Sequence, residues 1–126
     1  MKEEVTKERL SHLATLRREI TRTKRRIAKL KNQEHPSLPA KRSLKKLEKD
    51  LEDYITAANN EASFLIKYIQ SIKDVTVREI FMLRYYDGVR SWQKIAFSVG
   101  EHDESYVRRK HNAHFKTKSK KNTDNA

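Results

Sequence analysis

Two stripes of apolar residues run along the first half of the chain, with members three and four positions apart and dense charge between them. The first stripe, from about Glu4 to Leu30, consists of Leu13, Leu16, Ile20, Ile27 and Leu30, with Thr23 at its one polar position. The second, from about Ala40 to Lys73, consists of Leu44, Leu47, Leu51, Tyr54, Ala58, Leu65, Tyr68 and Ile72. Narrow stripes of this period predict two long helices with a coiled-coil seam. The second stripe widens towards its C-terminal half, where Phe64, Ile66 and Ile69 also fall, which predicts that this half packs against the helices of residues 74–118.

The segment QEHPSLPA, residues 33–40, interrupts the helical pattern and predicts a loop. Pro36 cannot continue the first helix, whereas Pro39 suits the first turn of the second. A short loop makes the two helices antiparallel neighbours, so residues 1–73 are predicted to form a helical hairpin. Because a two-helix hairpin is marginally stable alone, we expect a homodimer in which two hairpins form a four-helix bundle. The alternative is a monomer whose hairpin docks on the C-terminal domain.

Beyond the hairpin, the pattern changes to short helices. Thr76 and Glu79 match a capping box, in which the hydroxyl and the carboxylate each accept a free backbone N–H. The apolar residues that follow in this helix are Val77, Ile80, Phe81 and Leu83. Asp87 and Gly88 predict its end, because glycine tolerates the positive φ of a helix exit.

Two more short helices are predicted before the end of the chain. Ser91 is a suitable cap for a helix with the sequence WQKIAFSV, in which Ala96 is small enough for a close helix crossing. Gly100 lies where the chain must turn sharply, and Asp103 can cap a third helix, ESYVRRKHNAHFKTK. Short helices on either side of such a turn, with the last one basic, predict a helix-turn-helix.

The predicted fold is therefore all-α. An N-terminal antiparallel helical hairpin, or coiled coil, covers residues 1–73, and a three-helix helix-turn-helix domain covers residues 74–118. Residues 119–126, SKKNTDNA, contain no apolar residue before the last and are predicted to be a disordered tail.

Composition and charge indicate the class of partner. The formal net charge is +12 and the sequence pI is about 10, which favours a polyanion, with nucleic acid ahead of an acidic membrane surface. The charge is concentrated at the two ends: residues 1–32 contain eleven lysines and arginines against four glutamates, and residues 104–121 contain seven against one. The chain has no cysteine, no apolar run near the roughly 20 residues of a membrane span and no signal peptide, so we expect a soluble, cytoplasmic protein.

A basic third helix after a tight turn is expected to enter the major groove of double-stranded DNA. Residues near its start, namely Ser105, Tyr106, Arg108 and Arg109, are the candidates for base contacts, and Asn112 could pair with adenine. Residues better suited to phosphates are Arg90, Lys94, Lys116 and Lys118, and Ser91 completes the predicted DNA-binding set. For the basic first helix, a DNA contact surface and a solvated coiled-coil flank remain equal alternatives.

Other chemistries find little support in the residue pattern. His111 and His114 lie three positions apart with His102 nearby, but the chain has no cysteine and no acidic ligand at a suitable spacing, which argues against a zinc site. A glycine-rich phosphate loop, a nucleophile elbow and a catalytic carboxylate pair are all absent from the sequence. We therefore expect no enzymatic activity, no metal and no cofactor.

The segment LRYYDGVRSWQKIAFSVGEHDESYVRRKH resembles region 4 of sigma factors. It resembles more closely small phage and prophage proteins identified as ArpU- or RinA-type transcriptional regulators, which carry a helical hairpin before a similar ending. The matching residues are Leu83, Arg84, Tyr85, Asp87, Gly88, Ser91, Trp92, Ile95, Ala96, Gly100, Tyr106, Val107, Arg108, Arg109 and His111. Two departures bear on the docking angle of the third helix: the turn at residues 101–104 is one residue longer, and Lys110 stands where relatives place an apolar residue.

The resemblance implies a phage late-gene activator type of role on double-stranded DNA, with RNA polymerase as a further expected partner. The leading hypothesis is a non-enzymatic, sequence-specific DNA-binding transcriptional regulator. Two alternatives stay open: a DNA-packaging subunit of the small-terminase kind, which would assemble as a ring, and a module that binds RNA polymerase and uses its basic face only weakly.

Overall fold

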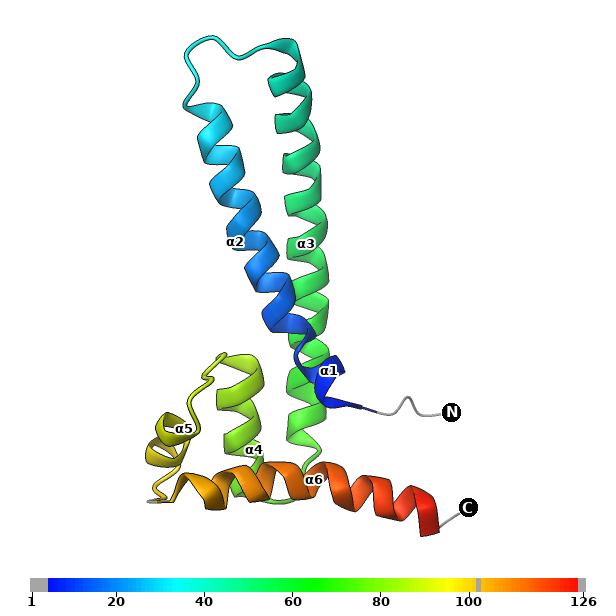
Figure 1. Cartoon of the computed structure of the whole chain (residues 1–126). Coiled ribbons are helices and arrows are strands. Elements are labelled where there is room, and N and C mark those ends of the chain that lie inside the picture. Colours follow the sequence, from blue (N-terminus) through cyan, green and yellow to red (C-terminus); the bar gives the residue numbers. More distant parts are fainter. Residues whose placement is uncertain (1–4, 102, 125–126) are drawn as a thin grey trace. The chain divides into compact units, whose positions relative to one another are not determined.

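The structure, a computed structural model, describes residues 5–101 and 103–124, with side chains described up to Lys116. This part of the chain is helical and contains no strand, so the predicted all-α class is confirmed (Figure 1). The elements in chain order are α1 (Lys7–Leu10), α2 (His12–Lys31), α3 (Leu38–Gln70), α4 (Val75–Phe81), the π-helix η1 (Met82–Tyr86), α5 (Trp92–Ser98) and α6 (Glu104–Asp124).

The chain divides into two compact units, and α3 contributes to both. Unit 1 comprises the residues up to Leu10 and those from Phe64 onwards, and unit 2 comprises residues 11–63. The predicted boundary between residues 73 and 74 therefore falls inside unit 1. Leu65 and Ile69 of α3 are buried in unit 1, as the widening of the apolar stripe predicted. Leu10 is also buried there, with 1% of its surface exposed, which no pattern in the N-terminal segment indicated.

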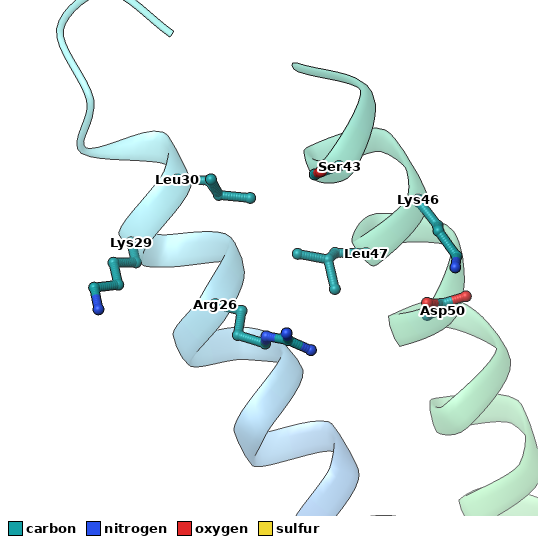
Figure 2. Close-up of a pocket in the computed structure, with 7 residues that line it drawn as sticks. All are labelled: Arg26, Lys29, Leu30, Ser43, Lys46, Leu47 and Asp50. Atoms are coloured by element: carbon teal, nitrogen blue, oxygen red, sulfur yellow. The ribbon is translucent and has the colours of Figure 1, made fainter. Parts of the chain in front are cut away.

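Unit 2 consists of α2 and the first part of α3, joined by a loop at residues 32–37. One face of α2 is covered; its buried residues are Leu13, Leu16, Thr23 and Ile27. The facing stripe of α3 is covered less completely, since Leu44, Leu47, Leu51 and Tyr54 all remain half-exposed. Near the loop, Leu30 and Leu47 point towards each other across an open pocket of about 460 Å³, with Arg26, Lys46 and Asp50 at its edges (Figure 2).

The first helix of the C-terminal segment begins two residues earlier than the predicted capping box. Asp74 is the N-cap of α4, and its Oδ1 accepts from the backbone N–H groups of Thr76, at 2.9 Å, and Val77, at 3.3 Å. The Thr76 and Glu79 capping box is therefore wrong. Asp74 takes the role because its extended backbone (φ −75°, ψ 117°) directs the carboxylate at the first free N–H groups.

After Phe81 the helix widens into the π-helix η1, a feature that the sequence pattern did not predict. Its wider turn closes with the Asp87 N–H donating to the Met82 carbonyl at 2.9 Å. Gly88, with φ +79°, then takes the chain out of the helix, as predicted.

The turns on either side of α5 follow the sequence signals closely. Ser91 Oγ accepts from the Lys94 N–H at 3.2 Å, Gly100 has φ +80°, and Asp103 Oδ1 accepts from the Ser105 N–H at 2.9 Å.

The last helix is longer than predicted. α6 runs to Asp124, past its predicted end at Lys118 and into the segment predicted to be a tail, and residues 119–124 contain no proline or glycine that would end the helix.

Candidate nucleic-acid interface

The buried face of α6 fixes which side of this helix is free to bind a ligand. Val107 is completely buried and His111 is 3% exposed, and the two lie one helical turn apart. Aromatic rings surround His111: the ring centroids of Trp92, Phe81 and Phe115 lie 5.0, 5.2 and 5.2 Å from its own. Such dense packing allows α6 a single rotation about its axis.

His111 is held by hydrogen bonds on both ring nitrogens. Its Nδ1 lies 2.9 Å from Asn112 Oδ1, and its Nε2 lies 2.5 Å from the Tyr85 hydroxyl. Because an amide oxygen can only accept, Nδ1 donates, and Nε2 accepts from Tyr85. Burial lowers the pKa of His111 to about 4 and raises the pKa of Tyr85 to about 12. Both side chains are therefore neutral at physiological pH and serve the core.

The opposite face of α6 gathers polar and basic side chains, and we call it the α6 outer face. Since an α-helix turns once every 3.6 residues, positions 105, 109, 112 and 116 fall on one side, away from Val107 and His111. Ser105, Arg109 and Lys116 are exposed there. Flexible cations and a hydroxyl on an open helix surface can donate hydrogen bonds to a polyanion.

Other predicted residues of α6 make contacts within the protein. Arg108 lies on the flank of the helix and pairs with Glu104 at 3.1 Å, and both side chains are 47% exposed. Tyr106 is half-buried, with the Lys110 ammonium 5.7 Å from its ring centroid. Asn112 accepts from His111, and its Oδ1 also lies 3.4 Å from the Lys7 ammonium of α1. Base contacts were predicted for Tyr106, Arg108 and Asn112, and in the structure each of these three side chains has a contact within the protein.

The residues predicted before and within α5 lie on its exposed side. Arg90 and Lys94 are exposed, and the hydroxyl of Ser91 is used as the helix cap. The backbone carbonyl of Arg90 accepts from the Arg84 guanidinium, whose central carbon lies 4.2 Å from the centroid of the Trp92 ring. Trp92 thus packs within unit 1.

Lys7 is the residue that sequence reasoning missed. It lies on α1 in unit 1, and its ammonium lies 5.5 Å from the centroid of the Phe115 ring as well as beside Asn112. This places an additional positive charge along α6. No pattern in the sequence pointed to Lys7, because the N-terminal segment joins this unit through the burial of Val5 and Leu10, which depends on contacts with distant residues.

The side chain of Lys118 and the whole of His102 lie outside the described parts of the chain. Among the described residues no group of three or more histidine, cysteine, aspartate or glutamate side chains could hold a metal ion. His114, one of the histidines considered for zinc, has its Nε2 2.7 Å from the Tyr68 hydroxyl, so it serves the packing between α3 and α6.

Comparisons with family models, with curated proteins and with solved structures found no match. None of the described helices combines the length and the apolar character that a membrane span needs.

Proposed function

We propose that the chain is a sequence-specific, double-stranded DNA-binding transcriptional regulator that inserts α6 into the major groove. α5 and α6 would form the helix-turn-helix, joined by the turn at Gly100. The observation that carries the proposal is the α6 outer face, where Ser105, Arg109 and Lys116 are exposed directly opposite the buried Val107 and His111. The regulatory role and the phage origin rest on the resemblance to ArpU- and RinA-type proteins.

The positions along α6 divide between base and phosphate contacts. Ser105 and Arg109 lie near the N-terminal end of the helix, the part of a recognition helix that reaches base edges, and arginine can bind guanine O6 and N7 with two hydrogen bonds. Lys116 lies two turns further on and would contact phosphates, together with Arg90 and Lys94 near α5. Arg108 can also contact a phosphate when it leaves its ion pair with Glu104, because an exposed ion pair of this kind is weak.

We propose a homodimer that associates through unit 2. The apolar stripe of α3 supports this, since Leu47, Leu51 and Tyr54 are only half-covered and Ile55 is 39% exposed. A second copy of α2 and α3 would cover this stripe in a four-helix bundle. Two recognition helices related by twofold symmetry would then address a palindromic or repeated site.

The test begins with selection of a preferred duplex from a random library, followed by fluorescence anisotropy of the selected duplex and of random DNA. If each head of the dimer contacts about five phosphates, log affinity should fall with log salt with a slope of about −4.5 per protomer, or about −9 for the dimer. Arg109→Ala should weaken binding to the selected site by about 1–3 kcal/mol and relax discrimination at one base pair, while Lys116→Ala should weaken both duplexes equally. A salt-independent affinity would refute the proposal, and an equal loss on random DNA would reassign Arg109 to a phosphate.

Light scattering of the purified protein in moderate salt tests the dimer. A ring of many subunits would favour a DNA-packaging subunit of the small-terminase kind instead. Capture of RNA polymerase by a protein that shows no measurable affinity for DNA would favour the polymerase-binding module.

A further inference from the structure

α2 has a charge pattern unlike that of the helix it packs against. It contains eight basic residues, namely Arg17, Arg18, Arg22, Lys24, Arg25, Arg26, Lys29 and Lys31, against the single acid Glu19. The part of α3 within unit 2 contains five basic and five acidic residues. The two helices share one unit and one solvent, so general solubility does not explain why only α2 is so one-sided.

The basic residues of α2 form a continuous face. Arg18, Arg22, Arg25 and Lys29 follow one another at intervals of four, three and four residues and are all exposed. We call these four residues the α2 basic face; it points away from the buried residues of α2, because residues so spaced lie on one side of a helix. A shallow depression of about 340 Å³ lies along it, lined by Arg17, Arg18, Thr21, Arg22 and Arg25. The same four-three-four spacing occurs on the α6 outer face at positions 105, 109, 112 and 116.

The arrangement weakens the helix. Like charges four residues apart repel each other, as at Arg18 with Arg22 and at Arg25 with Lys29. Glu19 relieves this at one point, where it pairs with Arg22 at 3.1 Å. α3 shows the ordinary solution, an ion pair of opposite charges four residues apart between Lys49 and Asp53 at 3.2 Å. Because this arrangement of charges reduces the stability of the helix, folding does not account for it, and we infer that the face binds a ligand.

We propose that the α2 basic face binds the phosphate backbone of duplex DNA without reading its sequence. The inference rests on the proposed function and adds to it a second DNA-binding surface, in unit 2. Arg18 and Lys29 are about 16 Å apart along the helix axis, a length over which duplex DNA carries about ten phosphate charges. Three of the four residues are arginines, which can bind a phosphate with two hydrogen bonds at once.

The chemistry of the face fits DNA better than an anionic membrane. Helices that bind membrane surfaces insert large apolar side chains beside their basic residues. In the described chain the large apolar residues that are exposed are Leu38, Ile55, Val75 and Phe97, and none of them belongs to α2. The large apolar side chains of α2 lie on its covered side, so its outer surface offers basic groups without a large apolar side chain that could enter a membrane.

The experiment compares two triple variants of the full-length protein. One carries Arg18→Gln, Arg22→Gln and Arg25→Gln on α2. The matched control carries Lys41→Gln, Arg42→Gln and Lys45→Gln on α3, which removes the same charge from exposed positions of the same unit. Anisotropy titrations over a range of salt use the selected duplex and a random duplex of equal length. Circular dichroism and light scattering check that helix content and mass are unchanged.

The α2 variant should make the slope of log affinity against log salt less negative by about 2.7 per protomer, or about 5.4 for the proposed dimer, one step of about 0.9 for each phosphate that is no longer neutralised. The contacts of each protomer should lose roughly 10- to 100-fold in affinity at moderate salt, equally on both duplexes, while the α3 control keeps the wild-type slope. An unchanged slope in the α2 variant, or an equal change in both variants, would overturn the inference. If the triple variant is misfolded, the single variants Arg22→Gln and Arg25→Gln should each change the slope by about 0.9 per protomer, and unchanged slopes would overturn the inference as well.

Two further outcomes separate this inference from its foundation and from a membrane role. Wild-type protein that binds neither duplex would remove the proposed function itself. If the wild-type protein binds DNA, and the α2 variant keeps both the preference for the selected duplex and the wild-type salt slope, only the inference about the α2 basic face is refuted. Flotation with phosphatidylserine vesicles that is abolished by the α2 substitutions, while the DNA slope stays at the wild-type value, would assign the face to a membrane.

Discussion

Titration of His111 tests the rotation of α6, on which the assignment of the α6 outer face depends. The side chain is 3% exposed and its pKa is lowered to about 4, with burial as the first cause, from an ordinary value of 6.5. In the unfolded chain the imidazole is in water and takes up a proton near pH 6.5. The folded protein therefore binds fewer protons than the unfolded chain between these two values.

The sign and size of the effect follow from this difference in bound protons. Above pH 6.5 His111 is neutral in both states and its titration does not affect stability. As the pH falls towards about 4, only the unfolded chain gains the proton, and the free energy of unfolding drops by about 1.4 kcal/mol per pH unit. The total loss is about 3 kcal/mol, complete below the folded pKa, and a large fraction of the stability of a small domain.

Urea unfolding at several pH values between 7.5 and 4 measures this loss. His111→Gln should be less stable at neutral pH, because the aromatic packing of the ring and its Nδ1–H bond to Asn112 are lost, but its stability should fall less steeply below pH 6.5. His35→Gln, in the exposed loop of unit 2, is the control that removes a histidine side chain outside unit 1. NMR of the His111 ring in the wild-type protein gives a second reading. A ring that titrates near pH 6.5 would show that His111 faces solvent and would refute the rotation that exposes Arg109.

Two further substitutions test the same region. Asn112→Ala should destabilise the protein by about 1–3 kcal/mol in urea unfolding, because the Nδ1–H of His111 loses its acceptor. The same variant should leave base discrimination unchanged. Altered discrimination with full stability would instead support the adenine contact predicted from the sequence. Gly100→Ala should cost about 1–2 kcal/mol by the same measurement, purely from its φ of +80°, since no atom lies within 4 Å of an added Cβ, and an unchanged stability would contradict this.

Local signals in the sequence located most of the elements. Ser91 and Asp103 cap their helices, and Gly88 and Gly100 adopt positive φ, because each of these effects involves backbone groups within three residues of the side chain. Helical periodicity also identified the stripe that is buried on α2. Such features depend on residues that are close together in the sequence, so the local sequence is enough to predict them.

Features that depend on distant residues were beyond this reasoning. Asp74 and Thr76 are both good caps, and Lys110, 36 residues away, binds Asp74 at 2.9 Å. That contact lowers the pKa of the Asp74 carboxyl and raises the pKa of the Lys110 ammonium. The place of α1 in unit 1 likewise depends on where Leu10 finds an apolar surface, and the short, charged segment around it has no period that could predict this.

The run Arg108, Arg109, Lys110 shows why a basic sequence does not by itself identify a binding surface. Successive residues of a helix point about 100° apart, so three neighbouring cations face three different directions. Arg108 turns to Glu104, Lys110 turns to Asp74 and stabilises the contact between α4 and α6, and Arg109 remains exposed on the α6 outer face. Lys110 stands where the resemblance places an apolar residue, and its long stem, with the ammonium at Asp74, fills that position without an uncompensated charge. The buried side of α6 therefore decides which cation of this run lies on the α6 outer face, and if that face binds DNA as proposed, removal of Arg109 should affect recognition most.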